Sequence, residues 1–284
     1  MNLRTLHQQS AARIIRVFPR RTKATPIDDL VRINCGPELW DEADEVHISV
    51  AFTWDLQRAE ELADQWRHVA PVMLGGPATG ERGGDFTPGM YLKRGYVITS
   101  RGCPNHCWFC SVPKREGNIR ELPITQGWNV LDDNLLACSD DHICDVFAML
   151  KEQPQKAQFT GGLEAKILRT WHVDLLADLR PQRIFFAYDT PDDYDPLVSA
   201  ARKIFKAGFL SPESNNVRAY VLIGYPSDTM QAAEKRMKDV LRTGMFPMAM
   251  VWRGESGYRD PAWVKFAWPW SRPACISSFK RQAA

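Results

Sequence analysis

From residue 96 onward the sequence alternates between short apolar runs and longer segments with helical periodicity. The short runs are typical of buried strands, and the longer segments carry apolar residues every three or four positions. The expected strands are 96–100, 128–132, 157–160, 183–188, 217–223 and 246–251, and the expected helices are 140–152, 164–179, 193–207 and 229–243. Because each helix must return the chain to the same end of the sheet, the strands should be parallel with right-handed crossovers. This order predicts an α/β fold, a partial (β/α)6 TIM-type barrel, with functional loops at the carboxyl ends of the strands.

The chain before the barrel predicts a second, smaller unit. Apolar runs at 46–51 and 72–74 flank a helical pattern at 55–68, which together predict a small N-terminal βαβ unit. The residues before Asp28 include six basic and no acidic side chains, so we expect a solvated or loosely docked basic segment, with a transit peptide as the alternative. The expected parts are a basic N-terminal lead-in at 1–27, the βαβ unit at 28–90, the partial barrel at 91–252 and an aromatic-rich C-terminal cap at 253–284.

Charge and cysteine content favour a cytoplasmic protein without membrane contact. Lys plus Arg total 36 and Asp plus Glu total 34, a net charge of +2 that gives no global attraction to nucleic acid or membranes. No apolar run approaches the ~18 residues of a membrane span, and no signal-peptide pattern begins the chain. Seven cysteines are an odd number that suits a reducing compartment. Four of them have spacings that match no cluster motif, and we expect ordinary thiols at Cys35, Cys138, Cys144 and Cys275.

The other three cysteines lie within the stretch RGCPNHCWFC, directly after the first expected strand of the barrel. Thiolates select zinc, copper(I) or iron–sulfur clusters, and Cys103, Cys107 and Cys110 are close enough in sequence to surround one compact centre. A closed structural site takes four protein ligands, whereas three leave a coordination position open to a small molecule. The pattern therefore indicates a reactive metal centre, and a zinc-binding or iron–sulfur module without catalysis is the alternative.

The spacing Cys-x-x-x-Cys-x-x-Cys, with aromatic Phe109 before the last cysteine, resembles the radical S-adenosylmethionine (radical SAM) superfamily. The resemblance implies that the three cysteines hold a [4Fe–4S] cluster whose remaining iron binds S-adenosylmethionine (SAM). It also implies an electron donor such as flavodoxin or ferredoxin, and reductive cleavage of SAM to a 5′-deoxyadenosyl radical that abstracts hydrogen from the substrate.

The same resemblance implies SAM contacts at the ends of the later strands. Acidic and amide side chains after the second strand are expected to accept hydrogen bonds from the SAM amino group. A Gly-Gly-x-Glu element follows the third strand, one strand later than is usual for the superfamily, and polar or glycine positions end the fourth and fifth strands. The cofactor-binding residues expected on this basis are Phe109, Asp132, Asp133, Asn134, Gly161, Gly162, Glu164, Asp189, Ile223 and Gly224. Ordinary turn or helix-capping roles are the alternative for each strand-end group.

The N-terminal unit is similar to part of the cobalamin-binding domain found in one radical SAM subgroup. The similarity lies in HISVAFTWDL and LGGPA, but the cobalt-ligating pattern D-x-H-x-x-G is absent. The nearest match, residues 140–145, lacks the glycine and lies on an expected helix after the cysteines. The ~90 residues before the barrel are also about half of what a complete cobalamin domain needs. We therefore expect a truncated domain and no cobalamin, with cobalamin-dependent methyl transfer as a second choice of reaction.

The sequence says less about the substrate than about the cofactors. The compact architecture resembles bacteriophage radical SAM enzymes linked to DNA hypermodification, which implies an isomerase that rearranges an amino acid attached to thymine. The basic lead-in could contact DNA phosphates, and four aromatic residues could stack on a flipped base: Trp263, Phe266, Trp268 and Trp270. A mutase or another radical reaction on a free small molecule is the alternative, with both segments purely structural.

Overall fold

The computed structural model describes residues 12–212, 214–254 and 256–283, which form two compact units. The first unit contains the described residues up to Glu81 together with Met90–Lys93. The second contains Arg82–Gly89 and the described chain from Arg94 onward. No helix in these described ranges combines the length and the apolar composition that crossing a membrane requires.

The second unit is built on a six-stranded parallel sheet, which confirms the predicted partial barrel. The strands are β5 (Tyr96–Val97), β8 (Asn129–Val130), β9 (Gln158–Phe159), β10 (Arg183–Ala187), β11 (Val217–Ile223) and β12 (Phe246–Val251). Their order in the sheet follows their order in the chain, and every neighbouring pair is parallel. Each strand end therefore lies beside the next strand end along one edge of the sheet.

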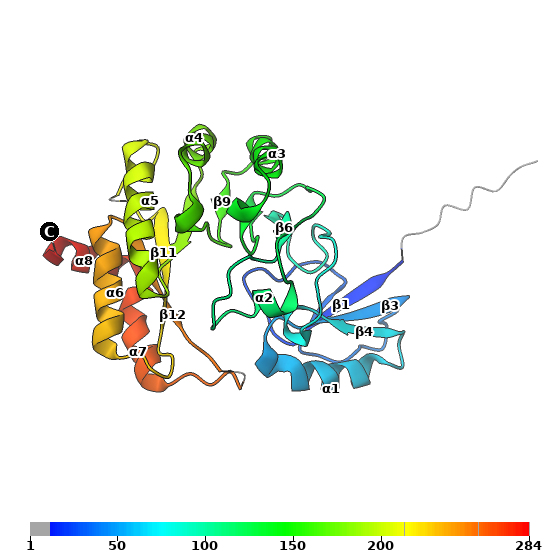
Figure 1. Ribbon diagram of the computed structural model, residues 1–284. Helices are drawn as coiled ribbons and strands as arrows, with labels where there is room; N and C mark the ends of the chain where they lie inside the picture. The colour runs from blue at the N-terminus through cyan, green and yellow to red at the C-terminus, as the bar shows by residue number, and fades with distance from the viewer. Residues whose placement is uncertain (1–11, 213, 255, 284) are drawn as a thin grey trace, which may run out of the picture. The chain divides into compact units, whose positions relative to one another are not determined.

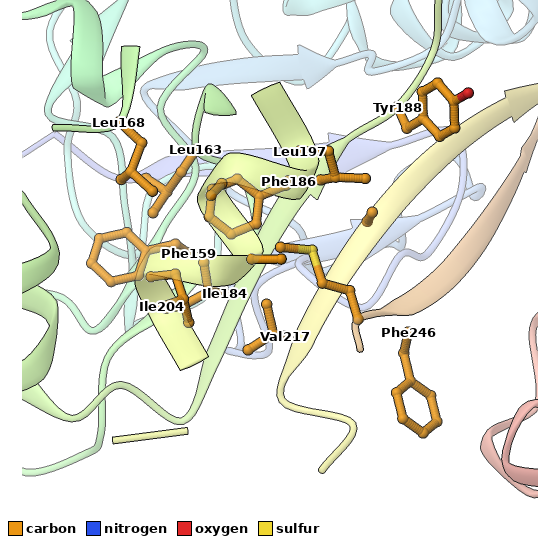
Figure 2. Close-up of a cluster of buried hydrophobic side chains, with 14 of the residues drawn as sticks. Phe159, Leu163, Leu168, Ile184, Phe186, Tyr188, Leu197, Ile204, Val217 and Phe246 are labelled. Carbon is orange, nitrogen blue, oxygen red and sulfur yellow. The ribbon is translucent and has the colours of Figure 1, made fainter. Parts of the chain in front are cut away.

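Helices α3 to α6 cover one face of this sheet (Figure 1). Their bounds are α3 (Asp140–Lys151), α4 (Thr170–Leu179), α5 (Tyr194–Lys206) and α6 (Met230–Arg242). Alternate residues of β11, from Val217 to Ile223, are at most 1% exposed, whereas those between them are partly exposed. Figure 2 shows Ile184 and Phe186 of β10 beside Leu197 and Ile204 of α5, in the core between the sheet and the helices. The opposite face of the sheet carries the other half of each strand's side chains.

Several elements are shorter than the sequence suggests. The expected strand at 96–100 ends at Val97, because Thr99 and Ser100 donate hydrogen bonds to the Asp132 side chain. The expected helix at 164–179 is divided into a short 3-10 turn and α4, since Arg169 is extended and its N–H donates to Nδ1 of His172. The 3-10 turns of this unit are Leu135–Ala137, Ala165–Ile167 and Pro191–Asp193.

Two further helices, α7 (Pro261–Trp270) and α8 (Pro273–Ala283), form the aromatic-rich C-terminal segment. Trp263, Phe266 and Trp270 follow a helical spacing that Pro269 obscures in the sequence. Trp270 is 5% exposed and belongs to the core of the second unit, so it is not free to stack on a base. Among these aromatic residues Trp268 is the most open, at 54% exposure.

The first unit is a four-stranded parallel sheet with one long helix. Its strand order is β2-β1-β3-β4. The elements are β1 (Ile14–Phe18), β2 (Val31–Ile33), β3 (Glu45–Ser49), α1 (Leu56–Trp66) and β4 (Val72–Gly75), with 3-10 turns at Thr53–Asp55 and Pro77–Thr79. The predicted strand–helix–strand series is present as β3, α1 and β4, and the sheet continues beyond it into β1 and β2.

This sheet corrects the interpretation of residues 12–27 as a loose basic lead-in. Strand β1 lies between β2 and β3, and Ile15 and Val17 are fully buried. Arg16 is 8% exposed and pairs with Asp28, while Arg20 pairs with Asp55. The basic composition of this segment is misleading, because these arginines have acidic partners on later segments of the chain. Arg4 lies outside the described residues.

Candidate functional site

The cysteine loop, residues 102–111, begins at the end of a short antiparallel pair and leads into a helix of one turn. The pair consists of β6 (Ser100–Arg101) and β7 (Arg120–Glu121), and the helix is α2 (Val112–Arg115). The backbone N–H of Cys103 donates to the carbonyl of Gly117 over 3.1 Å, and that of Cys110 donates to the carbonyl of Cys107 over 3.0 Å. The first bond ties the start of the loop to the segment after α2, and the second closes a turn from Cys107 to Cys110.

A buried carboxylate, Glu116, fixes the base of the loop. It is 3% exposed and accepts a hydrogen bond from Nε of Arg115 at 3.0 Å. Arg101 and Arg120 form ion pairs with it at 3.8 and 3.7 Å, and the N–H of Gly83 also donates to it. Removing one partner from such a buried network leaves the remaining charges uncompensated. Glu116 is not among the expected site residues, because its contacts with Arg101 and the Gly83 N–H become apparent only in the fold.

Two thiols of the loop, those of Cys107 and Cys110, favour their protonated form in the absence of a cation. Burial raises the pKa of Cys110, and the nearby Cys103 adds to the effect. The pKa of Cys107 is raised by desolvation and then by Cys110 and Cys103. A bound metal cluster would supply the positive charge that keeps them as thiolates. Within the described residues no three His, Cys, Asp or Glu side chains are gathered tightly enough for a single metal ion.

The acidic residues after β8 have structural partners. Asp132 is 1% exposed and accepts hydrogen bonds from the N–H and hydroxyl of Thr99 and the hydroxyl of Ser100, at 2.6–2.7 Å. Desolvation is the largest influence on Asp132 and raises its pKa despite these bonds. Asp133 accepts a hydrogen bond from the N–H of Gly102 at 2.8 Å, at the start of the cysteine loop. Both carboxylates thus hold the loop and the end of β8 together.

Asn134 offers the open acceptor that the sequence analysis expected at this strand end. Its Nδ2 donates to the Glu164 carboxylate at 2.6 Å and contacts Sγ of Cys103 at 3.4 Å. The residue is 4% exposed, and its Oδ1 is buried with no hydrogen-bond partner among the described residues. Buried acceptors are normally satisfied. An ammonium group placed beside Oδ1 would satisfy it, and Glu164 nearby would stabilise the positive charge.

The glycines after β9, Gly161 and Gly162, allow the backbone there to lie close to the end of β8. A Cβ on Gly161 would lie 2.5 Å from the backbone oxygen of Asp132, so a larger residue would separate the ends of β8 and β9. Gly162 has a φ of +99°, a conformation that L side chains rarely adopt. The close backbone packing at Gly161 and the positive φ at Gly162 therefore place Glu164 within hydrogen-bond distance of Asn134.

Asp189 at the end of β10 is a second candidate for polar contacts. Its Oδ1 accepts a hydrogen bond from the N–H of Leu222 at 2.8 Å, which connects the ends of β10 and β11. The pKa of Asp189 is raised to about 6, mainly by burial and in smaller part by the charge of Asp193. Both aspartates also raise the pKa of Cys107, so they lie on the cysteine-loop side of the strand ends.

At the end of β11, Ile223 is fully buried in the core and its carbonyl accepts the N–H of Trp252. Gly224 has a φ of +76°, and a Cβ there would lie 2.8 Å from the Trp263 ring. The Gly224 N–H donates to Asp228 at 2.9 Å, and Asp228 in turn pairs with Arg236 at 2.8 Å. The Ile223 side chain is therefore directed away from any ligand, and the glycine leaves room for Trp263.

Aromatic rings connect the cysteine loop to the end of β11. Phe109 packs edge-on against Trp108, with ring centroids 5.4 Å apart. Trp108 in turn meets Tyr225 at 5.5 Å and is 58% exposed. The cysteine loop therefore contacts the end of β11 through Trp108, and the end of β8 through Asp133 and Asn134. Asp193 and Asp228 were not predicted, because nothing in their local sequence distinguishes them from ordinary turn residues.

Comparison with known proteins identifies the fold. No protein-family profile and no curated protein matches the chain. Among solved structures the chain is similar to TsrM from Kitasatospora setae, a radical S-adenosylmethionine methyltransferase with cobalamin and a [4Fe–4S] cluster bound. The TM-score is 0.60, with 10% identity over 84% of this chain and 74% of that one. Coproporphyrinogen III oxidase (HemN) from Escherichia coli, also a radical SAM enzyme, gives a TM-score of 0.45 with 11% identity over 66% of this chain and 52% of that one.

The chain therefore shares its fold with TsrM. The likeness to TsrM agrees with the partial barrel that the strand order predicts. At 10% identity it shows the architecture and not the activity, so the reaction must be argued from the site itself.

Proposed function

We propose that the chain is a radical SAM enzyme whose cysteine loop binds a [4Fe–4S] cluster. Cys103, Cys107 and Cys110 would be the ligands, and SAM would lie between the loop and the strand ends. The observation that carries the proposal is the unsatisfied Oδ1 of Asn134, next to Glu164 and in contact with Cys103. A cysteine loop, a buried acceptor and a carboxylate at the same end of a partial barrel suit a ligand that has an amino group and also reaches the cluster.

The residues of this chain bind and orient, while the cofactors supply the chemistry. A flavodoxin or ferredoxin would reduce the cluster. The reduced cluster and SAM together would supply the chemistry, which is cleavage of a carbon–sulfur bond to give a radical that abstracts hydrogen from the substrate. Asn134 would accept a hydrogen bond from the SAM amino group. Asp189 would accept one from a hydroxyl group of the ligand, through the carboxylate oxygen that does not bind Leu222.

The proposal is tested by product formation. The protein is reconstituted anaerobically with iron and sulfide, reduced with dithionite and given SAM, and 5′-deoxyadenosine is measured. Each of Cys103→Ala, Cys107→Ala and Cys110→Ala should lose both the cluster absorbance and the product, because two cysteines cannot hold the cluster.

Cys144→Ala is the matched control, because this exposed thiol lies on α3, outside the loop. It should retain the cluster and the product. A wild-type protein with an intact cluster that forms no 5′-deoxyadenosine would refute the enzymatic proposal and favour the non-catalytic iron–sulfur module.

For the substrate we infer an amino acid attached to thymine in DNA, rearranged by an isomerase reaction. Exposed basic side chains at Arg13, Arg21 and Lys23 support DNA binding, as does Trp268, whose ring lies 3.8 Å below the Arg272 guanidinium. Mass spectrometry of DNA from cells that produce the protein with its genomic neighbours tests this. If the DNA is unmodified while a free amino acid or nucleotide is converted, the substrate is a small molecule.

A cobalamin-dependent methyltransferase is the second candidate, because TsrM is a methyltransferase with cobalamin bound. We propose that this chain does not bind cobalamin, since D-x-H-x-x-G is absent and its nearest match lies on α3. Protein refolded with hydroxocobalamin should show no corrinoid absorbance after desalting. Stoichiometric retention of the corrinoid would contradict this and favour methyl transfer.

A further inference from the structure

We propose that Arg183 and Arg218 form a binding site for an oxyanion of the substrate, a carboxylate or a phosphate, on the face of the sheet opposite the helices. The inference rests on the proposed radical SAM function, for which it specifies one chemical group of the substrate. The two arginines are not part of the cysteine loop or of the strand ends described above.

The register of the sheet places both arginines on this face. Ile184 pairs with Val217, and both are buried against the helices. Side chains alternate along a strand, so Arg183 and Arg218 lie on the other face, on neighbouring strands and about two residues apart in register. They are close enough that the charge of Arg183 lowers the pKa of Arg218, in addition to the larger effect of desolvation.

Neither arginine has a carboxylate partner among the described residues. The one hydrogen bond of the Arg218 side chain goes from Nε to the carbonyl of Asn215, at 2.8 Å. Nε of Arg183 is buried without any partner in the described part of the chain. A half-buried pair of like charges is unfavourable unless a counter-ion satisfies it. Other buried arginines of this chain, Arg16 and Arg236, do have such carboxylates.

Aromatic side chains on the same face of the sheet hold the Arg218 guanidinium in place. The Arg218 guanidinium lies 5.7 Å from the centre of the Phe185 ring, and Phe185 stacks on Tyr220 at 4.6 Å. The Tyr220 hydroxyl donates to the carbonyl of Thr160, and the Thr160 hydroxyl donates to Oδ1 of Asn129. These contacts hold Arg218 against an aromatic surface and leave its donors available for a planar or tetrahedral oxyanion. Two guanidinium groups offer the paired N–H donors that bind carboxylate and phosphate in bidentate geometry.

The position also constrains the substrate. Thr160 directly precedes the Gly161-Gly162 pair, so the hydrogen-bond chain from Tyr220 reaches the site at the strand ends. Arg218 is the second residue of β11, six residues before Gly224, a rise of about 20 Å along the strand. A substrate whose anion binds here must extend much of that length toward the cysteine loop. This favours an elongated molecule, such as a nucleotide or an amino acid attached to a base.

Small anions on the full-length reconstituted protein test the site directly. Trifluoroacetate is followed by fluorine NMR as a carboxylate probe, and inorganic phosphate by phosphorus NMR, both at low ionic strength. One probe should bind saturably, and the tighter of the two identifies the substrate group. Arg183→Gln and Arg218→Gln should each weaken that binding at least tenfold, whereas Arg218→Lys, which keeps the charge, should lose less.

Arg202→Gln is the matched control, an exposed arginine on α5 that should leave probe binding unchanged. Thermal unfolding checks the fold: the probe should raise the melting temperature of the wild type but not of the double glutamine variant. Equal binding by wild type and glutamine variants, or no saturable binding of either probe, overturns the proposal. Cleavage of SAM to 5′-deoxyadenosine is measured without substrate on the wild type and on Arg202→Gln, so loss of the oxyanion site in the glutamine variants and failure of the radical SAM function are separate results.

Discussion

At the scale of single residues, Asn134 is the position where a substitution should separate SAM binding from cluster binding. Its Oδ1 is the buried acceptor without a partner in the described chain, while the three cysteines alone hold the cluster in our proposal. Asn134→Ala should weaken SAM binding about tenfold, the ~1.4 kcal/mol that one hydrogen bond to a charged group contributes. Equilibrium dialysis of SAM on the reconstituted protein measures this. Gln126→Ala, at an exposed amide, should bind SAM as the wild type does, and an equal loss in both variants would contradict the assignment.

The raised pKa of Asp189 predicts that the stability of the protein depends on pH. Its pKa rises from 3.8 in the unfolded chain to about 6 in the fold, which corresponds to about 3 kcal/mol. A raised carboxyl pKa means that stability is fully present below pH 3.8 and is lost as the pH rises through 6. Asp189→Asn removes this loss and keeps an oxygen for the Leu222 N–H. In urea unfolding of the metal-free protein, the variant should therefore gain stability at pH 8 and about half as much at pH 5. A gain independent of pH would show that Asp189 is not the titrating group.

At the scale of elements, the junction of β8 and β9 should tolerate no side chain at Gly161. The Cβ of Gly161→Ala would meet the Asp132 backbone oxygen at 2.5 Å, and backbone atoms cannot move away as a flexible side chain can. Overpacking of this kind costs about 1–3 kcal/mol. Circular dichroism should show a lower melting temperature, together with weaker SAM binding because Glu164 moves away from Asn134. Gly84→Ala is the control, since a Cβ there meets no atom within 4 Å. Equal stability of both variants would contradict the role of Gly161.

The elements also show why part of this structure can be predicted from sequence. Strand β11 is predicted at its observed bounds, because its residues alternate between a helix-covered face and an open one. The first strand of the barrel is predicted too long, since Thr99 and Ser100 leave the strand pairing to bind the Asp132 carboxylate, 33 and 32 residues away. Contacts between residues far apart in sequence also limit what can be predicted of the site. The cysteines form a local motif, whereas Arg101 and Gly83 reach Glu116 from earlier segments and become apparent as its partners only in the fold.

At the scale of the whole molecule, strand β1 changes how DNA binding must be tested. Deleting residues 1–24 removes an inner strand of the first unit, whose side chains are buried from Ile15 to Phe18. Such a truncation would expose the core of that sheet, and a change in DNA affinity could not be assigned to charge. Substitutions at exposed basic residues beyond the strand avoid this problem.

The double variant Arg21→Gln/Lys23→Gln is therefore the appropriate test of DNA binding. Both side chains are exposed, and neither has an acidic partner in the described part of the chain. Each lysine or arginine that neutralises a phosphate releases about 0.9 counter-ion from duplex DNA. If both contact DNA, the slope of log affinity against log salt should become less steep by about 2, measured by fluorescence anisotropy from 50 to 200 mM salt. Lys238→Gln removes a charge that is paired with Glu234 on α6, and it should leave the slope unchanged. Wild-type binding without a salt dependence would contradict the DNA substrate, and an unchanged slope in the double variant would place the phosphate contacts elsewhere on the chain.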